Sequence, residues 1–310
     1  MNIDGLTRIG NLVPAGGCFG GVDLEFNLAL VFMVRNHTYN LMGQPITQKQ
    51  KSLGFAYHRP NPQSVLRVFC FPYAGSGIIA YRNWAAGLPL DIEVCPIQLP
   101  GRGHRIRQPL FTECSALVTA LENDVKAYAD KPFVFFGHSM GALLAFEVAR
   151  RLGSREGPLH LFVSGRSAPQ IPRRHKRKLS DLPDGELLQE LRRLDGTPSQ
   201  ILARPEMVKE MLPVLRADFS VVESYSYQAT PPLTCPISAY AGSEDAIIKQ
   251  DVEAWSRQTT STFSFTAFPG GHFFIQTSQR LLLEVLRREL SRYTRQNDRD
   301  ALPPPYDGQG

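Results

Sequence analysis

The sequence predicts an α/β fold in which a mostly parallel central sheet is covered by helices on both faces. Short runs rich in β-branched and aromatic residues alternate with longer segments of helical periodicity, which is the pattern of such a sheet. The alternation is interrupted once, late in the chain, by a segment with helical patterns of its own. A length of 310 residues, 43% of them hydrophobic, suffices for one large domain with a full core.

The individual elements follow from the apolar runs and their boundaries. We expect strands at Val65–Cys70, Ile92–Ile97, Phe133–Phe136, Leu159–Ser164, Ile237–Ala241 and Phe263–Phe268. We expect helices at Ile78–Ala86, Ser115–Tyr128, Met140–Leu152, Asp251–Gln258 and Ser278–Tyr293.

The interruption covers residues 169–234 and contains two groups of apolar residues at helical spacing. The first group is Leu182, Leu187, Leu188, Leu191 and Leu194, and the second is Val208, Met211, Leu212, Leu215 and Phe219. An insertion at this point of an α/β sheet is a candidate lid over an active site. The alternative is a helical hairpin without a role in catalysis.

The two ends of the chain differ from the middle. Residues 1–62 lack periodicity and are punctuated by glycine and proline, so we expect a poorly structured extension or a mis-assigned start. Residues 296–310 end in a proline-rich stretch, for which we expect a disordered tail. The predicted domain therefore occupies residues 63–295.

Composition argues against several classes of function. The net charge of +5 comes from 34 basic and 29 acidic residues without a basic stripe, so we expect no nucleic-acid partner. The five cysteines are scattered and lack the spacing of a zinc site, so we expect no metal and no cofactor. The apolar run at residues 28–34 is too short to span a bilayer and no signal peptide accompanies it, so we expect a cytoplasmic protein that does not bind membranes.

The segment Gly137-His138-Ser139-Met140-Gly141 carries the strongest chemical signal. It follows a predicted buried strand directly and opens a predicted helix, which is the setting of the nucleophile elbow in the α/β-hydrolase fold. The turn is tight, so small residues two positions before and after the serine avoid a collision. The sequence therefore predicts Ser139 as a nucleophile at the N-terminus of a helix.

A serine hydroxyl needs a base, and the base needs an orienting carboxylate, in the chain order Ser, acid, His. Of the seven histidines, His272 alone follows a late strand in the right order. Asp245 follows the preceding strand beyond a Gly-Ser turn and is the predicted acid. The other candidates for the acid are Glu244, beside Asp245, and Asp251. The alternative role of Asp251 is to cap the N-terminus of the next helix.

Acyl transfer also requires hydrogen-bond donors for the tetrahedral oxyanion. One is usually the backbone N–H after the nucleophile, here that of Met140. The second usually comes from the loop after an early strand. That loop is Phe71-Pro72-Tyr73-Ala74-Gly75-Ser76-Gly77, with Ala74 or Tyr73 as the donor.

With these residues in place, residues 66–293 resemble the type II thioesterases, the free-standing editing enzymes of polyketide and nonribosomal-peptide synthesis. Six motifs in order carry the resemblance: Phe71-Pro72-Tyr73-Ala74-Gly75, Leu99-Pro100-Gly101-Arg102-Gly103-His104-Arg105, Gly137-His138-Ser139-Met140-Gly141-Ala142, Ser164-Gly165-Arg166-Ser167-Ala168-Pro169, Gly196-Thr197-Pro198 and Gly271-His272-Phe273-Phe274.

The resemblance implies hydrolysis of acyl groups from the phosphopantetheine thiol of an acyl- or peptidyl-carrier protein, with Ser139, His272 and Asp245 as the triad. Medium-chain thioesterases of fatty-acid synthesis share the architecture and are the nearest alternative. An esterase or acyltransferase on the same scaffold, and a non-catalytic hydrolase-like binding protein, are the more distant ones.

Four arginines are candidates for contact with the carrier protein or its phosphopantetheine. Arg102 and Arg105 lie in the motif after the second strand, where they either meet the phosphate or an acidic helix, or pair internally and hold the loop. Arg173 and Arg174 open a basic cluster at the start of the lid, which is either a docking patch or a solvated loop.

Overall fold

The computed structural model describes residues 61–173, 177–194, 197 and 199–300. The predicted extension at residues 1–62 falls almost entirely outside this part, as do residues 301–310 of the predicted tail.

All six expected strands are present and form one sheet. They are β1 (Leu66–Phe71), β2 (Ile92–Pro96), β3 (Phe133–His138), β4 (Leu161–Ser164), β5 (Ile237–Gly242) and β6 (Phe263–Phe268). Their spatial order is β2-β1-β3-β4-β5-β6, and every pairing between these strands is parallel. The predicted α/β architecture is confirmed, and all the strands therefore end at one edge of the sheet.

Helices connect the strands and match the expected segments with some differences. They are η1 (Ile78–Tyr81), α3 (Trp84–Gly87), η2 (Gly103–Arg105), α4 (Cys114–Lys126), α5 (Met140–Glu156), α9 (Lys249–Glu253), η3 (Ala254–Gln258), α10 (Phe274–Thr277) and α11 (Gln279–Asp300). Two segments predicted as single helices are each divided, into η1 and α3 and into α9 and η3. Helix α11 continues to Asp300, past the point where we expected the tail to begin.

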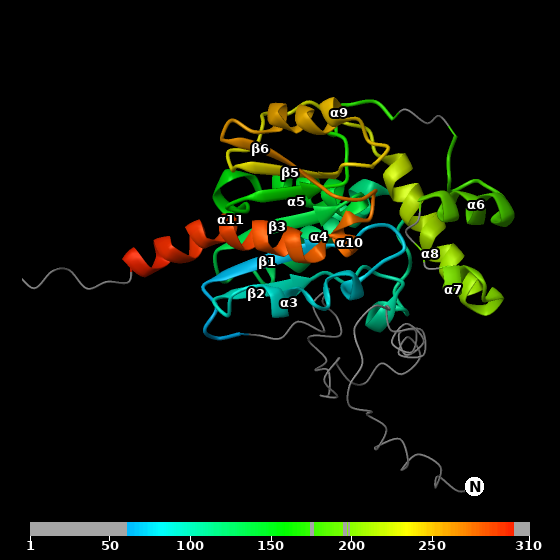
Figure 1. Cartoon of the computed structure of the whole chain (residues 1–310), viewed down its shortest axis with the longest axis horizontal. Helices are drawn as coiled ribbons and strands as arrows, with labels where there is room; N and C mark the ends of the chain where they lie inside the picture. The colour runs from blue at the N-terminus through cyan, green and yellow to red at the C-terminus, as the bar shows by residue number, and fades with distance from the viewer. Residues whose placement is uncertain (1–60, 174–176, 195–196, 198, 301–310) are drawn as a thin grey trace, which may run out of the picture.

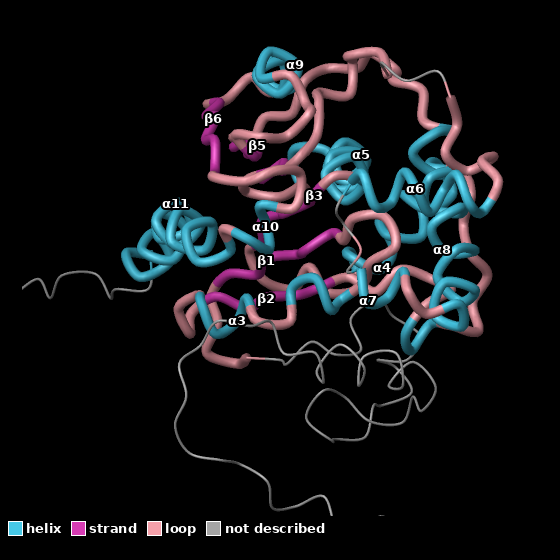
Figure 2. Tube along the Cα trace, turned by 45° about the vertical axis from the view of Figure 1, so that its right-hand side comes forward, coloured by secondary structure: helices cyan, strands magenta, loops and turns pink. Residues whose placement is uncertain are grey.

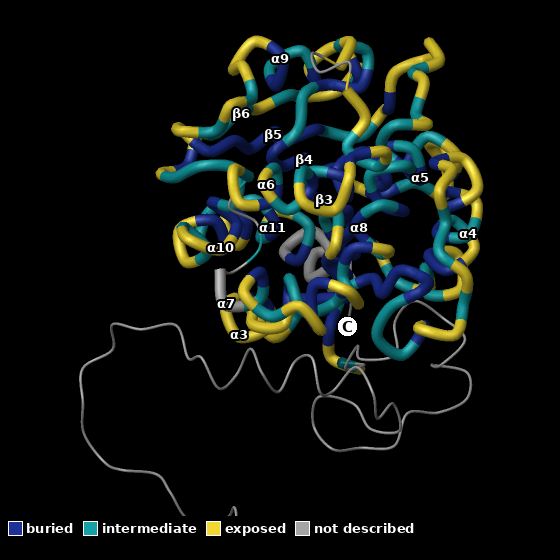
Figure 3. The backbone as a smooth tube through the Cα atoms, turned by 90° about the vertical axis from the view of Figure 1, so that its right-hand side faces the viewer, coloured by how far each residue is buried: buried dark blue, intermediate teal, exposed yellow. Residues whose placement is uncertain are grey.

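Side chains alternate between the two faces of the sheet and build two layers of core. Phe69 and Phe135 point to the face covered by α4, α5 and η3, where Trp255 is fully buried. Val68 and Phe136 point to the opposite face, which α3, α10 and α11 cover. Each such side chain contributes about 1.5–3 kcal/mol by leaving water. Figure 3 shows β5 as a buried strand, whereas the edge strand β6 is mostly intermediate or exposed.

The insertion after β4 is helical, as expected. It forms α6 (Asp184–Leu194), α7 (Ser199–Leu202) and α8 (Pro205–Ser224), which lie together on one side of the sheet (Figures 1 and 2). The three helices share a small apolar cluster that includes Leu187, Leu202 and Leu212. The last turns of α8 join the main core through Val221, so α8 connects the insertion to the body of the domain.

Candidate active site

The serine of the elbow has the strained backbone that the motif requires. Ser139 has φ 54° and ψ −114° and is the one non-glycine residue with positive φ among those described. Such a conformation costs about 1–3 kcal/mol and persists only where the surroundings impose it. Here the N–H of Ser139 donates to the carbonyl of Ser164 on β4 at 2.8 Å, and α5 begins at the next residue.

The two glycines of the elbow are there because nothing larger fits. A Cβ on Gly137 would stand 2.2 Å from the carbonyl oxygen of Gly141, across the turn. A Cβ on Gly141 would stand 2.0 Å from the carbonyl oxygen of Phe71, at the end of β1. The first turn of α5, with the N–H of Met140, is therefore held against the loop that follows β1.

The predicted base and acid are paired. His272 Nδ1 lies 2.8 Å from Asp245 Oδ2, and the side chain of Asp245 is only 3% exposed. A carboxylate at Nδ1 fixes the proton on that nitrogen and leaves the Nε2 lone pair to act as a base. The alternative acid Glu244 is exposed, whereas the backbone N–H of Ile247 donates to Asp245 Oδ1 at 3.2 Å and helps to hold its carboxylate.

The loops that carry this pair are packed directly on each other. The N–H of Glu244 donates to the carbonyl of Gly270 at 3.0 Å. A Cβ on Gly242, the last residue of β5, would stand 2.2 Å from the carbonyl oxygen of Gly271. The ends of β5 and β6 thus bring Asp245 and His272 together, although they are 27 residues apart in the sequence.

His138, inside the elbow, joins this histidine loop to the nucleophile. Its ring centroid lies 5.1 Å from that of His272 and 5.9 Å from that of Phe273, and its Nδ1 is 2.9 Å from Ser164 Oγ. Burial, and then the nearby charge of His272, hold the pKa of His138 well below its ordinary value. His138 is therefore a neutral packing partner for the loop that follows β6, a role we did not predict from the sequence.

The loop that follows β1, residues 72–77, which we call the oxyanion loop, is the segment in which we expected the second oxyanion donor. The N–H of Ser76 donates to the carbonyl of Tyr73 at 3.0 Å, and the N–H of Gly75 donates to Asp218 Oδ2 at 2.7 Å. These two donors are engaged within the protein, which leaves Tyr73 and Ala74 as the candidates named from the sequence.

A family model described as a thioesterase domain matches residues 66–290. The chain belongs to the thioesterase family. Its relatives include the gramicidin S biosynthesis protein GrsT of Aneurinibacillus migulanus, 45% identical over 74% of this chain and 91% of that protein. A medium-chain S-acyl fatty acid synthase thioesterase of Homo sapiens is 34% identical over 69% of this chain and 83% of its own.

Solved structures agree with this assignment. RedJ, a thioesterase from the prodiginine pathway of Streptomyces coelicolor, is 38% identical and superposes with a TM-score of 0.69 over 74% of this chain and 92% of its own. The type II thioesterase BorB from the borrelidin cluster is 35% identical, with a TM-score of 0.69 over 75% of this chain and 95% of its own. The predicted α/β-hydrolase fold and the resemblance to type II thioesterases are confirmed, and the protein is a thioester hydrolase.

Two of the four candidate carrier contacts are engaged inside this thioesterase. Arg102 forms a bidentate pair with Asp218, and Arg105 Nη1 contacts Asp124 Oδ2 at 2.7 Å and the carbonyl of Gln98 at 3.0 Å. Both arginine side chains are largely buried. Both arginines therefore form internal pairs that hold the loop, which is the second of the two alternatives considered from the sequence.

The other two candidates lie at the start of the lid. Arg173 is 40% exposed and approaches Glu223 Oε1 at 3.4 Å, a long contact that leaves its guanidinium accessible. Arg174 lies outside the described residues. Arg173 is therefore the one of these two candidates that the structure describes, and its guanidinium remains accessible to a partner.

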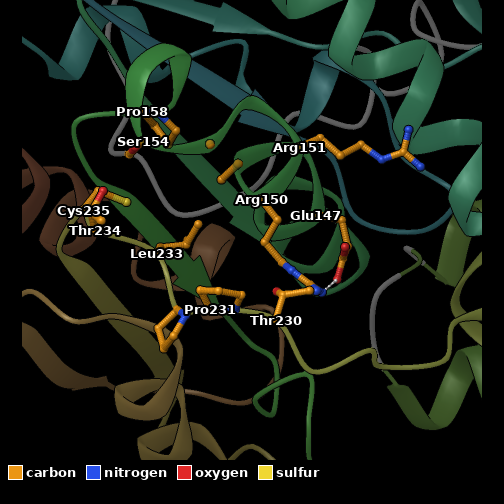
Figure 4. Close-up of a pocket in the computed structure, with 13 residues that line it drawn as sticks. Glu147, Arg150, Arg151, Ser154, Pro158, Thr230, Pro231, Leu233, Thr234 and Cys235 are labelled. Atoms are coloured by element: carbon orange, nitrogen blue, oxygen red, sulfur yellow. Dashed lines mark hydrogen bonds and ion pairs between the residues drawn. The ribbon is translucent and has the colours of Figure 1, made fainter.

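A separate cavity of about 480 Å³ lies beside the far turns of α5 (Figure 4). It is lined by residues of α5 and by the segment 230–235 that leads into β5, and none of Ser139, Asp245 and His272 lines it. Its Arg150 is bound by Glu147 at 2.8 Å and Thr230 at 2.6 Å. The cavity lies towards the amino end of β5, away from the strand ends that carry Ser139, Asp245 and His272.

Among the described residues, no cluster of three or more His, Cys, Asp and Glu side chains is arranged to hold a metal ion. In the same part of the chain, no helix combines the length and apolar character needed to cross a bilayer.

Proposed function

We propose that Ser139, His272 and Asp245 are the catalytic triad of an editing thioesterase that releases acyl groups from the phosphopantetheine thiol of a carrier protein. The observation that carries the proposal is the 2.8 Å contact between His272 and Asp245, on a loop that packs against the strained Ser139 elbow. We infer the carrier-bound substrate from the relatives, whose names link them to gramicidin, prodiginine and borrelidin biosynthesis.

The geometry supports an ordinary two-step hydrolysis. Ser139 Oγ attacks the thioester carbonyl while His272 Nε2 takes the hydroxyl proton, and the negative oxygen accepts hydrogen bonds from the N–H groups of Met140 and Ala74. The C–S bond then breaks, and the phosphopantetheine thiolate receives the proton from His272. A water molecule, activated by the same histidine, hydrolyses the acyl-serine and restores the enzyme. Asp245 orients His272 and stabilises its protonated form throughout.

The test is release of acyl groups from loaded carrier proteins, followed by mass spectrometry, with wild type and Ser139→Ala. We expect the variant to lose several orders of magnitude in rate, because the members of a triad act as a unit. Unchanged release by Ser139→Ala eliminates this mechanism. Poor release from carriers together with good turnover of free oxyesters identifies an esterase instead.

The same assay separates the two thioesterase alternatives by substrate. Carriers loaded with short or aberrant polyketide and peptide units are compared with carriers loaded with medium-chain fatty acyl groups. An editing enzyme releases the first set at least as fast as the second. A clear preference for medium fatty chains favours the fatty-acid alternative, which the similarity to the human enzyme also supports.

We further propose that the basic cluster at the start of the lid contacts the carrier protein through Arg173. Its exposed guanidinium supports this, since acidic surfaces on a partner attract such a charge. Arg173→Glu should raise KM for a carrier-bound substrate and leave KM for a small acyl thioester unchanged. Arg288→Glu, a matched reversal at a 71% exposed residue of α11, is the control and should change neither value. Equal effects of Arg173→Glu on both substrates contradict the docking proposal.

A further inference from the structure

Asp218 is a buried carboxylate that reaches from the lid helix α8 into the oxyanion loop. It is 1% exposed, and its Oδ2 accepts the backbone N–H of Gly75 at 2.7 Å. Both of its oxygens also bind Arg102, with Nη1 to Oδ2 and Nη2 to Oδ1 each at 2.6 Å. Arg102 Nη1 in turn donates to the carbonyl of Ser76 at 3.0 Å. One ion pair thus holds the backbone of two successive residues of the loop.

A second contact from the same face of α8 fixes the loop at the same point. Leu215 lies three residues before Asp218, so the two side chains share one side of the helix. A Cβ on Gly75 would stand 2.5 Å from Leu215 Cδ2, and Gly75 has φ 78°, a conformation that favours glycine. The helix therefore touches the loop by one apolar and one charged residue, and Gly75 permits that close approach.

The held residues directly follow the candidate oxyanion donors. The peptide plane that carries the N–H of Gly75 also carries the carbonyl of Ala74. Fixing this N–H therefore fixes one of the two peptide planes that meet at Ala74, and it restrains the neighbouring plane that carries the N–H of Ala74. A donor in an oxyanion hole must be preorganised to within a few tenths of an ångström, because its contribution depends on not having to reorganise during the reaction. The contacts of Asp218 supply that restraint from outside the loop.

The charge of Arg102 is needed for this arrangement to help catalysis. A lone carboxylate beside a developing oxyanion repels it, and a buried carboxylate without a partner is itself costly. The bidentate guanidinium offsets that negative charge while leaving the Gly75 contact in place.

We propose that Asp218, paired with Arg102, is a positioning residue that sets the second oxyanion donor, so that helix α8 of the lid is part of the catalytic apparatus. This inference rests on the proposed function, because it assigns the oxyanion role to the loop at residues 72–77. It gives the insertion a direct link to the active site, since any displacement of α8 also displaces the oxyanion loop.

The test compares Asp218→Ala and Asp218→Asn with wild type on a small acyl thioester, for kcat and KM separately. We expect Asp218→Ala to lower kcat by about 100-fold, as loss of an oxyanion donor does, with KM changed less than about threefold. Asp218→Asn keeps an oxygen that accepts the Gly75 N–H, so its kcat should fall between the two. This second variant keeps the proposal testable if Asp218→Ala does not fold.

The matched control is Glu93→Gln, which breaks a buried ion pair with Arg67 at 2.6 Å, where both side chains are at most 7% exposed. That pair lies at the amino ends of β1 and β2, away from the site. Glu93→Gln should lower the melting temperature as the Asp218 variants do, yet keep kcat within about twofold of wild type. If Asp218 had a structural role only, all three variants would lower the melting temperature and keep kcat close to that of wild type.

A second readout isolates the oxyanion. An acyl trifluoromethyl ketone forms a tetrahedral adduct with the serine, and we expect its affinity to fall in Asp218→Ala by the same factor as kcat/KM. Unchanged ketone affinity, or a kcat within about threefold of wild type, overturns the proposal. Activity that survives in Ser139→Ala instead overturns the proposed function, so the two failures are distinguishable.

Discussion

Replacing Gly141 with alanine is the smallest change that forces α5 away from the end of β1. The new Cβ would stand 2.0 Å from the carbonyl oxygen of Phe71 and 2.9 Å from that of Pro72, both backbone atoms. Real Cβ contacts essentially never come closer than 3.0 Å. The contact with the Phe71 oxygen is about 1 Å too short, so the helix and the strand end must separate by about 1 Å.

Neither side can move freely. The carbonyl of Phe71 accepts the hydroxyl of Tyr81 at 2.6 Å, and that tyrosine is 1% exposed. On the other side, Met140 and Ala142 are fully buried in the first turn of α5. Overpacking of this kind costs about 1–3 kcal/mol. A misplacement of about 1 Å in the groups that hold the substrate costs about 100-fold in rate, and the N–H of Met140 lies in the turn that must shift.

The assay is kcat on a small acyl thioester together with thermal unfolding. We expect Gly141→Ala to lose about 100-fold in kcat and about 2–4 °C in melting temperature for each kcal/mol lost. Gly185→Ala in α6 is the control, because no atom beyond its neighbours and its own helix backbone lies within 4 Å of its Cβ position. It should keep the wild-type kcat and a melting temperature at least as high as that of wild type. Wild-type kcat in Gly141→Ala refutes the reasoning, since the oxyanion donors would then not depend on this contact.

Two further predictions concern titratable groups. Asp245→Asn should lower kcat by about 10⁴-fold, because an amide favours the wrong tautomer of His272, whereas Glu244→Gln should leave kcat unchanged; the reverse order would make Glu244 the acid. Burial lowers the pKa of His160 to about 3, whereas the unfolded chain binds this proton near pH 6.5. The free energy of unfolding therefore falls as the pH drops below about 6.5, by up to about 1.4 kcal/mol per pH unit. Urea unfolding between pH 7 and pH 4 should show a shallower loss in His160→Gln than in wild type, and identical slopes would contradict the assignment.

The parts of the molecule that were predictable have local signals. The run Phe133–Phe136 followed at once by Gly-x-Ser-x-Gly specifies strand, turn and helix within a few residues, and the structure follows it closely. The segment from Ile78 lacks such a signal. Its predicted single helix is divided into η1 and α3, which seat Tyr81 and Trp84 against Phe136 with ring centroids 6.0 and 4.7 Å away. Tertiary packing decided that element, and periodicity alone does not report it.

The acid of the proposed triad was predictable to within one position only. Glu244 and Asp245 are neighbours with the same chemistry, so the sequence ranks them only by the Gly-Ser turn before them and the apolar residues 246–248 behind them. The structure separates them by environment, since Glu244 is exposed while the carboxylate of Asp245 is buried against His272. A difference of one residue after a tight turn reverses the direction of the side chain, and that direction is set by the packing of the Gly242 and Gly271 backbones.

Asp218 lacked any such motif because its partners are remote, 116 residues away at Arg102 and 143 residues away at Gly75. The sequence shows Arg102 as an unassigned cation, and a cation near a predicted active site fits a phosphate as well as it fits an internal carboxylate. One signal was nevertheless present. Asp218 lies three residues after Leu215 and four residues before Val222, on the apolar face of α8. A charge therefore occupies a position that the helical periodicity assigns to the interior. A carboxylate placed there must have a buried partner, and in the structure Arg102 supplies it, whereas Arg105 of the same motif pairs with Asp124.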